Sequence, residues 1–125
     1  MGRIAADTSA FYAIADPTRR AILDLLRTEA GADETRRTVL VLLERLATSI
    51  DGLSQSGLSQ HLAVLLRAGL VTARKKGRMR IYSLRAKPLN EVADWVGPYD
   101  KFWGSKLDNL HTFLDSHGAR RSTRS

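Results

Sequence analysis

The sequence predicts a mainly α-helical domain with one small β-hairpin, and three observations support this fold class. Five segments carry apolar residues at the helical spacing of three and four. Two short runs of strand-forming residues, joined by a glycine, lie between the last two of these segments. The chain of 125 residues is long enough for one domain with a core and too short for two ordinary ones. We expect one domain over residues 1–117 and a disordered basic tail over residues 118–125.

The composition is typical of a soluble globular protein, with 43% hydrophobic and 26% charged residues. No apolar run approaches the ~20 residues of a membrane span, and the first residues, "MGRIAADTSAF", contain no signal-peptide core. The absence of cysteine excludes disulfides and thiolate metal sites. We therefore expect a cytoplasmic protein, associated with the nucleoid in a prokaryote, that has no membrane partner.

The net charge of +7 is concentrated in one third of the chain. Residues 54–87 contain eight Lys or Arg and no Asp or Glu, whereas residues 88–117 contain two Lys and five acids. A surface that only keeps a protein soluble mixes the two signs of charge. The cationic block therefore favours a polyanionic partner.

The first two predicted helices lie on either side of "ADPT". Residues 7–15 form the first, with Phe11, Tyr12 and Ile14 as its apolar members. Asp16 can cap the second helix and Pro17 suits its first position, where a missing N–H costs nothing. The buried face of the second helix is predicted to contain Ile22, Leu23, Leu25 and Leu26. Residues 29–34 are expected to be a polar loop.

A helix-turn-helix follows in the sequence. The third helix is predicted over residues 38–50, and the Asp-Gly pair at 51 and 52 ends it with a tight turn. Ser54 is a good N-cap for the fourth helix, and Gly69 supplies its left-handed stop. The apolar stripe of the third helix consists of Val39, Leu42, Leu43, Leu46 and Ile50, and that of the fourth consists of Leu58, Leu62, Leu65 and Leu66.

The N-terminal end of the fourth helix is polar, and its side chains lie off the apolar stripe. Glutamine and serine there can donate and accept hydrogen bonds at the edges of DNA bases. The alternative is a solvated helix end without a ligand. His61 fits either a phosphate contact or ordinary surface packing. The predicted DNA contacts of this helix are Ser54, Gln55, Ser56, Ser59, Gln60 and His61.

The hairpin is predicted from "LVTARK" and "MRIYSLR", joined by "KKGR" with Gly77 in the turn. A helix-turn-helix followed by such a hairpin is a winged helix-turn-helix, and the hairpin is its wing. Lys75, Lys76, Arg78 and Arg80 are expected to contact phosphates, and Arg78 is the best placed to enter a minor groove.

The last helix is predicted over residues 88–117, with a kink or a looser turn where Gly97 and Pro98 interrupt it. It contains five of the eight aromatic residues, more than the core of one such domain needs. This surplus predicts a homodimer interface. The expected interface residues of the first and last helices are Phe11, Tyr12, Trp95, Tyr99, Phe102, Trp103, Leu107, Leu110 and Leu114.

The sequence does not predict an enzyme or a cofactor site. It lacks a phosphate-binding loop of the GxxxxGK type, a GxSxG motif and an HExxH motif. The three histidines are far apart in the predicted fold. No pair of acids, or acid with His, has a convincing spacing.

Two segments, "ADPTRRAILDLL" and "LSQSGLSQHLAVLLRAGLVTARKKGRMRIYSL", resemble the ArsR family of bacterial winged-helix repressors, and the similarity extends over residues 8–117. The resemblance implies a homodimer formed by the first and last helices, with each recognition helix in a major groove and each wing on the flanking backbone. The chain departs from the family by about ten extra residues, spread over "EAGADETRR" and "ATSID".

Many members of the family release DNA when a metal binds, but this chain lacks their ligands. It has no cysteine, and its closest imitation of an Asp-x-His pair is Asp115 with His117, which no later His follows. No metal is therefore expected. The aromatic pattern of the last helix more resembles the metal-free autorepressors of the family.

The function predicted from these observations is a dimeric transcriptional repressor that binds double-stranded DNA at a palindromic operator, with autorepression as one form of this function. Two alternatives stay open. The first is a protein-binding anti-activator or adaptor that uses the aromatic last helix. The second is a repressor that responds to a small molecule in an aromatic pocket, lined by Phe11, Tyr12, Trp95, Tyr99 and Trp103.

Overall fold

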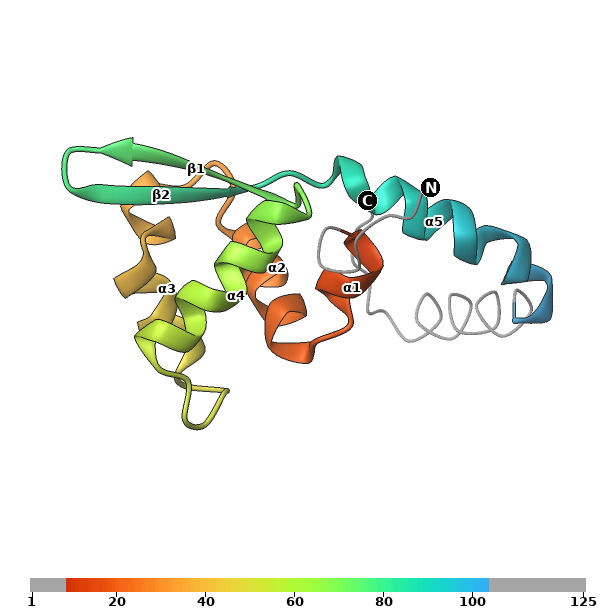
Figure 1. Ribbon diagram of the computed structural model, residues 1–125, viewed down its shortest axis with the longest axis horizontal. Helices are drawn as coiled ribbons and strands as arrows, with labels where there is room; N and C mark the ends of the chain where they lie inside the picture. The colour runs from red at the N-terminus through yellow and green to blue at the C-terminus, as the bar shows by residue number, and fades with distance from the viewer. Residues whose placement is uncertain (1–8, 104–125) are drawn as a thin grey trace, which may run out of the picture. The chain divides into compact units, whose positions relative to one another are not determined.

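The computed structural model describes residues 9–103, and the chain divides into two compact parts, residues 1–92 and 93–125. The first part contains α1 (Ala10–Ile14), α2 (Pro17–Thr28), the 3₁₀ helix η2 (Glu34–Arg37), α3 (Val39–Leu46), α4 (Gln55–Arg67), β1 (Val71–Lys76), β2 (Met79–Leu84) and the 3₁₀ helix η3 (Lys87–Leu89) (Figure 1). Helix α5 (Asn90–Val96) continues into the second part, where the 3₁₀ helix η4 (Gly97–Phe102) follows. The predicted fold class, helices with one β-hairpin, is confirmed.

The helix ends follow the local signals in the sequence. The Asp16 carboxylate accepts the backbone N–H of Arg19, and Pro17 opens α2. Ser54 caps α4 in the same way, by accepting the N–H of Gly57. Gly69 follows α4 with a φ of +76°, a left-handed conformation that glycine adopts without steric cost.

The core lies between α2, α3, α4 and the base of the hairpin. Its largest fully buried side chains are Ile22, Leu26, Leu42, Leu58, Leu62, Leu65, Leu70 and Ile81. Each such side chain contributes about 1.5–3 kcal/mol by leaving water. The predicted stripes of the second, third and fourth helices therefore form the core, while Leu25, Val39, Leu43, Ile50 and Leu66 are half-buried at its edges.

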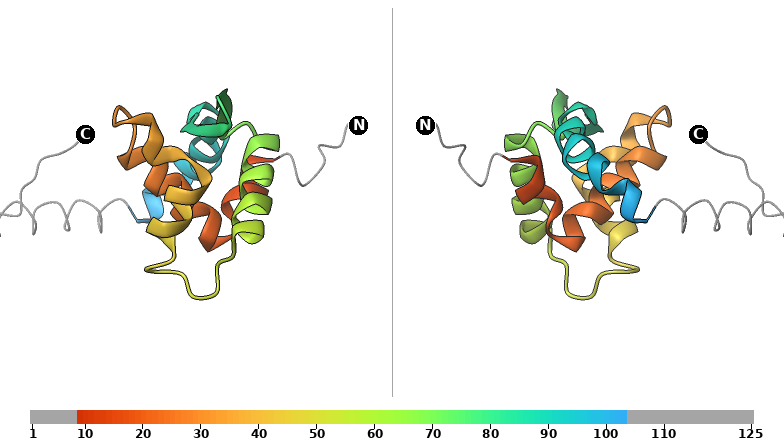
Figure 2. Two further views of the ribbon diagram at one scale, coloured as in Figure 1. Left: turned by 90° about the vertical axis from the view of Figure 1, so that its left-hand side faces the viewer. Right: turned by 90° about the vertical axis from the view of Figure 1, so that its right-hand side faces the viewer.

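Two expectations about the segments around α3 are wrong. The third helix ends at Leu46 rather than residue 50, and residues 47–54 form a longer connection than the predicted tight turn. Figure 2 shows this connection extending beyond the ends of α3 and α4. In addition, residues 29–34 are not simply a polar loop, because Glu29 is buried and Glu34 begins η2.

The hairpin has the expected position and turn. Strands β1 and β2 pair antiparallel from Val71 opposite Leu84 to Lys76 opposite Met79. Gly77 has a φ of +63° in the two-residue turn, and Arg78 after it does not have a positive φ. Glycine at the first turn position is typical of a type II′ hairpin. A single β-bridge joins Thr38, just before α3, to Ile81 in β2.

The last helix differs from its prediction in the part of the chain that the structure describes. A 3₁₀ turn contains Pro88, α5 ends at Val96, and η4 replaces the α-helix from Gly97. The interruption expected at Gly97 and Pro98 is confirmed, since proline has no N–H to continue the α-helical pattern. Leu107, Leu110, Leu114 and the basic tail lie outside the described residues. Within residues 9–103, no helix is long and apolar enough to cross a bilayer.

Candidate nucleic-acid interface

The N-terminal end of α4 presents polar side chains to solvent. Leu58, Leu62 and Leu65 are buried at intervals of three and four, so that the opposite face of the helix is exposed. The exposed residues are Ser54, Gln55, Ser56, Ser59 and Gln60. Their amides and hydroxyls can bond to base edges or phosphates in a groove of DNA.

The cap of α4 explains the glycine in its first turn. The Ser54 hydroxyl lies 3.0 Å from the Gly57 nitrogen and 3.2 Å from the Ser56 hydroxyl. A Cβ added at Gly57 would lie 3.2 Å from the Ser54 hydroxyl, which is tighter than ordinary packing. Gly57 therefore leaves room for the cap.

His61 lies on the side of α4 that faces the start of α2. Its Nδ1 is 3.2 Å from the Arg19 guanidinium, and its Nε2 is 4.0 Å from the Asp16 carboxylate. Arg19 is itself buried and donates to the carbonyls of Ala13 and Tyr12. These contacts favour the packing role of His61 over the phosphate contact.

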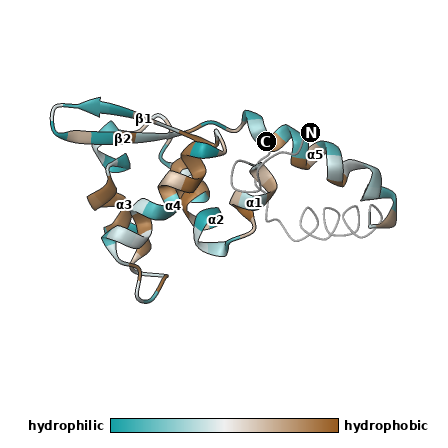
Figure 3. Ribbon diagram, viewed as in Figure 1, coloured by the Kyte–Doolittle hydropathy of each residue, from teal (hydrophilic) through white to brown (hydrophobic). Residues whose placement is uncertain are grey.

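The hairpin distributes its cations over two faces. Residues directly opposite each other in an antiparallel pair point to the same face of the sheet, and successive residues alternate. The register therefore places Lys75 and Arg80 on one face, and Arg74 and Lys76 on the other. All of these residues are exposed, as is Arg78 in the turn. In Figure 3 the hairpin is mostly hydrophilic toward its tip.

Glu34 joins this cationic surface from a distant part of the sequence. One oxygen of its carboxylate bonds to Arg74 and the other to Lys76, which are 40 and 42 residues away. These hydrogen bonds, from Lys76 first and then Arg74, lower the pKa of Glu34 to about 2. The cationic block is free of acids along the chain, but an acid lies against it in space. No sequence signal at Glu34 indicated this pairing.

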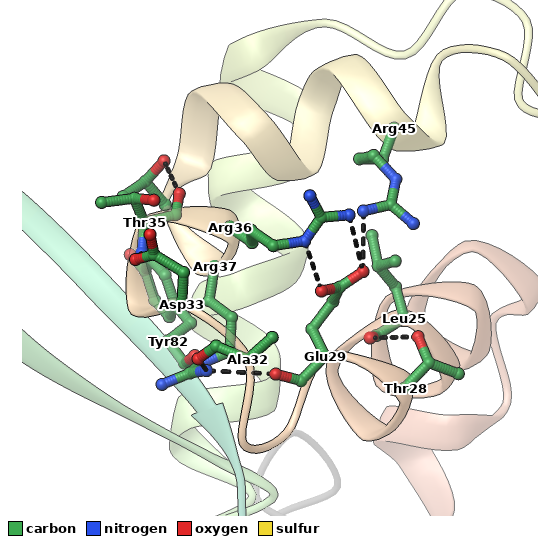
Figure 4. Close-up of polar contacts among 11 residues, drawn as sticks. Leu25, Thr28, Glu29, Ala32, Asp33, Thr35, Arg36, Arg37, Arg45 and Tyr82 are labelled. Atoms are coloured by element: carbon green, nitrogen blue, oxygen red, sulfur yellow. Dashed lines mark hydrogen bonds and ion pairs between the residues drawn. The ribbon is translucent and has the colours of Figure 1, made fainter.

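The segment around Glu34, residues 29–38, is attached to both the helices and the hairpin (Figure 4). The Arg37 side chain donates to the carbonyls of Tyr82, Glu29 and Ala32 at 2.9, 3.2 and 3.3 Å. The Glu29 carboxylate is paired with Arg36 at 2.6 Å and with Arg45 at 2.7 Å. Hydrogen bonds from Arg36 and Arg45 lower the pKa of Glu29 to about 2. We call residues 29–38 the connecting segment.

The polar end of α4 and the wing lie on the same side of the first part. Strand β1 runs back along the direction of α4 after the turn at Gly69, so that the N-terminal end of α4 and the hairpin tip both lie at the left of Figure 1. One extended polyanion can therefore meet both.

The predicted interface residues that the structure describes are exposed aromatic side chains. In the second part, the rings of Trp95, Tyr99 and Phe102 follow one another in tilted contacts, with centroids 5.2 and 6.4 Å apart, and Trp103 is also exposed. In the first part, Phe11 and Tyr12 of α1 are 38% and 42% exposed. These side chains leave apolar ring surface exposed to solvent.

Within residues 9–103, no three His, Cys, Asp or Glu side chains are grouped in a way that could hold a metal ion. Asp115 and His117 lie outside the described residues. The expected absence of a metal stays a prediction.

Comparison with known proteins places the chain among transcriptional regulators. A family model described as a helix-turn-helix domain matches residues 14–74. The chain is 36% identical over 88 residues to the HTH-type transcriptional regulator YuzN of Bacillus subtilis (strain 168), a match that covers 69% of this chain and 90% of that protein. It is 34% identical over 86 residues to the transcriptional repressor SdpR of the same organism, covering 69% of this chain and 83% of that one.

The fold has a similar counterpart among solved structures. The crystal structure of an ArsR family transcriptional regulator superposes with a TM-score of 0.59 and 27% identity, covering 84% of this chain and 98% of that one. Fold, helix-turn-helix and relatives together define a winged helix-turn-helix transcriptional regulator and not an enzyme. The chain belongs to the ArsR family.

Proposed function

We propose that the protein is a homodimeric repressor that binds a palindromic operator in double-stranded DNA. The observation that carries this proposal is the exposed polar end of α4 on the same side of the domain as the cationic hairpin. The similarity to the repressor SdpR supports a repressing role. The bound dimer represses by occluding the site at which the polymerase binds. This proposal places the protein in the cytoplasm, at the nucleoid.

In this proposal the two DNA-binding elements have different tasks. Gln55, Ser56, Ser59 and Gln60 contact base edges in the major groove, while Ser54 fixes the start of the helix beside a phosphate. The wing contacts the flanking backbone through its cations, and Arg78 in the turn enters the minor groove. Two-fold symmetry places the recognition helices about 34 Å apart, one turn of DNA.

The dimer is proposed to form through the exposed aromatic residues of the first and last helices. Rings that remain in water gain free energy when a partner covers them. The alternatives of an adaptor and of a small-molecule sensor depend on the same aromatic residues. No observation within residues 9–103 favours either of them over a dimer.

Footprinting on the DNA upstream of the protein's own gene tests the function. We expect a protected site with two-fold symmetry, and a mobility shift on that site at lower protein concentration than on a random duplex. The matched control is the protein with Gln55 and Gln60 both changed to Ala, which should lose the footprint and keep weak binding to random duplex. An adaptor would show no salt-dependent binding to either DNA.

A further inference from the structure

The wing has five cations, and they are not equivalent. Arg74, Lys75, Lys76, Arg78 and Arg80 are all exposed. Arg74 and Lys76 share the carboxylate of Glu34, with one oxygen bonded to each. Lys75, Arg78 and Arg80 have no acidic partner among residues 9–103, although Arg80 lies over the Tyr82 ring at 5.9 Å. The two paired cations are on one face of the hairpin, and Lys75 and Arg80 are on the other.

The position of Glu34 is fixed by the connecting segment. The Asp33 carboxylate accepts the N–H of Thr35 at 3.0 Å and so closes the turn that begins η2. Arg37 bonds to the carbonyl of Tyr82, and Thr38 forms its bridge with Ile81. Glu34 therefore approaches β1 from a segment that is bound to β2. Its side chain is 24% exposed, against 57% for each of its two partners.

A carboxylate that bonds two cations occupies the place that a phosphate would take. While Glu34 bonds to Arg74 and Lys76 it cancels one of their two positive charges, and a phosphate that approaches either cation meets the Glu34 carboxylate as a like charge. An exposed ion pair contributes little to folding. Glu34 is held beside the two cations by the connecting segment as well as by the ion pair, so its negative charge stays there when DNA approaches.

We propose that Glu34 keeps Arg74 and Lys76 from contacting DNA phosphates, so that the wing holds the backbone through Lys75, Arg78 and Arg80. Glu34 is a positioning residue that acts through these two cations and limits the electrostatic, sequence-independent part of DNA binding. The proposal rests on the DNA-binding function proposed above, and it reassigns Lys76 from a phosphate contact to a partner of Glu34.

Neighbouring lysines on opposite faces provide the first test. The full-length variants Lys75→Gln and Lys76→Gln remove the same charge from adjacent positions, and binding to a random duplex is measured over a range of salt concentrations. Each phosphate contact contributes about −0.9 to the slope of log K against log salt. Lys75→Gln should flatten the slope of the dimer by about two, and Lys76→Gln by less than about half of one. Equal flattening by the two variants overturns the proposal.

Removal of the carboxylate provides the second test. Glu34→Gln frees both cations, so its slope should become more negative by one to about four units in the dimer, with tighter binding to random duplex. The control is Glu44→Gln in α3, which removes one negative charge, as Glu34→Gln does. The Glu44 carboxylate is exposed and has no partner among the described residues, so the slope of this variant should match that of the wild type. An unchanged or flatter slope for Glu34→Gln also overturns the proposal.

The two proposals fail in different ways. If the wild-type protein shows no salt-dependent binding to DNA, the proposed function is wrong. If it binds but Lys75→Gln and Lys76→Gln behave alike, only the role of Glu34 is wrong. Circular dichroism and thermal melting verify that each variant folds. If Glu34→Gln does not fold, the comparison of Lys75→Gln with Lys76→Gln still tests the role of Glu34, because both lysines are exposed.

Discussion

At Gln55 the chain enters α4 with an exposed amide that no contact within the described residues explains. An amide of this kind can bond to N6 and N7 of adenine together, which distinguishes one base from the other three. We expect Gln55→Ala to weaken operator binding by about 1–3 kcal/mol and to relax the sequence preference at one base pair.

Competition mobility shifts with operators substituted at single positions measure this preference. Arg67→Gln, at the other end of α4, is the comparison variant on the same helix. If Gln55→Ala weakens operator and random duplex equally, the side chain does not contact a base.

Ser54 illustrates a residue whose role is readable from its neighbours in the sequence. Its hydroxyl accepts the Gly57 N–H at 3.0 Å, one of the four donors that a helix leaves unpaired at its start. Ser54→Ala should therefore lower the free energy of unfolding by about 1 kcal/mol, measured by urea denaturation.

Ser59→Ala is the matched control for the cap. Ser59 is exposed in the second turn of the same helix, and its change should stay within about 0.5 kcal/mol of the wild type. Equal losses for the two variants would contradict a capping role for Ser54.

At the scale of elements, the sequence predicted what depends on nearby residues. The caps at Asp16 and Ser54, the stop at Gly69 and the turn at Gly77 each follow from a few adjacent residues, and all are in their expected places. The buried stripes were also predictable, since helical periodicity decides which side chains can reach the core.

The missed features depend on residues far apart in the chain. The burial of Glu29 requires Arg45 from α3, 16 residues later, and the position of Glu34 requires two wing residues about 40 positions away. A polar run such as residues 29–34 looks alike whether it is solvated or paired. Its role could not be predicted without the fold.

Glu29 connects three elements and makes the fold sensitive to acid. Its pKa falls from 4.5 to about 2 in the folded protein. The stabilisation from its charge is therefore complete above pH 4.5 and is lost as the pH falls toward 2. Glu29→Gln should lower the urea midpoint at neutral pH and should reduce the further loss of stability on acidification.

Urea midpoints at about pH 7 and about pH 3 measure both effects. Glu44→Gln removes a carboxylate without a described partner and should behave as the wild type. If Glu29→Gln loses as much stability between the two pH values as the wild type does, Glu29 is not the group that senses acid.

For the whole molecule, the proposed dimer depends on exposed aromatic residues. Phe102 is 72% exposed, and its ring makes a tilted contact with the ring of Tyr99. Phe102→Glu should raise the dissociation constant of the dimer by about thirtyfold or more, because a buried aromatic ring at the centre of an interface contributes about 2 kcal/mol.

Leu40→Glu is the matched control for this change. Leu40 is 66% exposed in α3 and is not part of the predicted interface, so its variant should remain dimeric. Light scattering after size exclusion, over a series of protein concentrations, determines the mass. A wild-type protein that is monomeric at all concentrations, or a Phe102→Glu variant that dimerises as tightly as the wild type, would rule out this interface.

The most direct measurement is the salt dependence of binding by the wild-type protein to its footprinted operator and to a random duplex of equal length. Three wing cations from each of two protomers predict a slope of about −5 on both. The polar end of α4 predicts binding to the operator that is at least ~10³-fold tighter at every salt concentration. Equal affinity for the two duplexes, or binding that does not change with salt, would contradict the account.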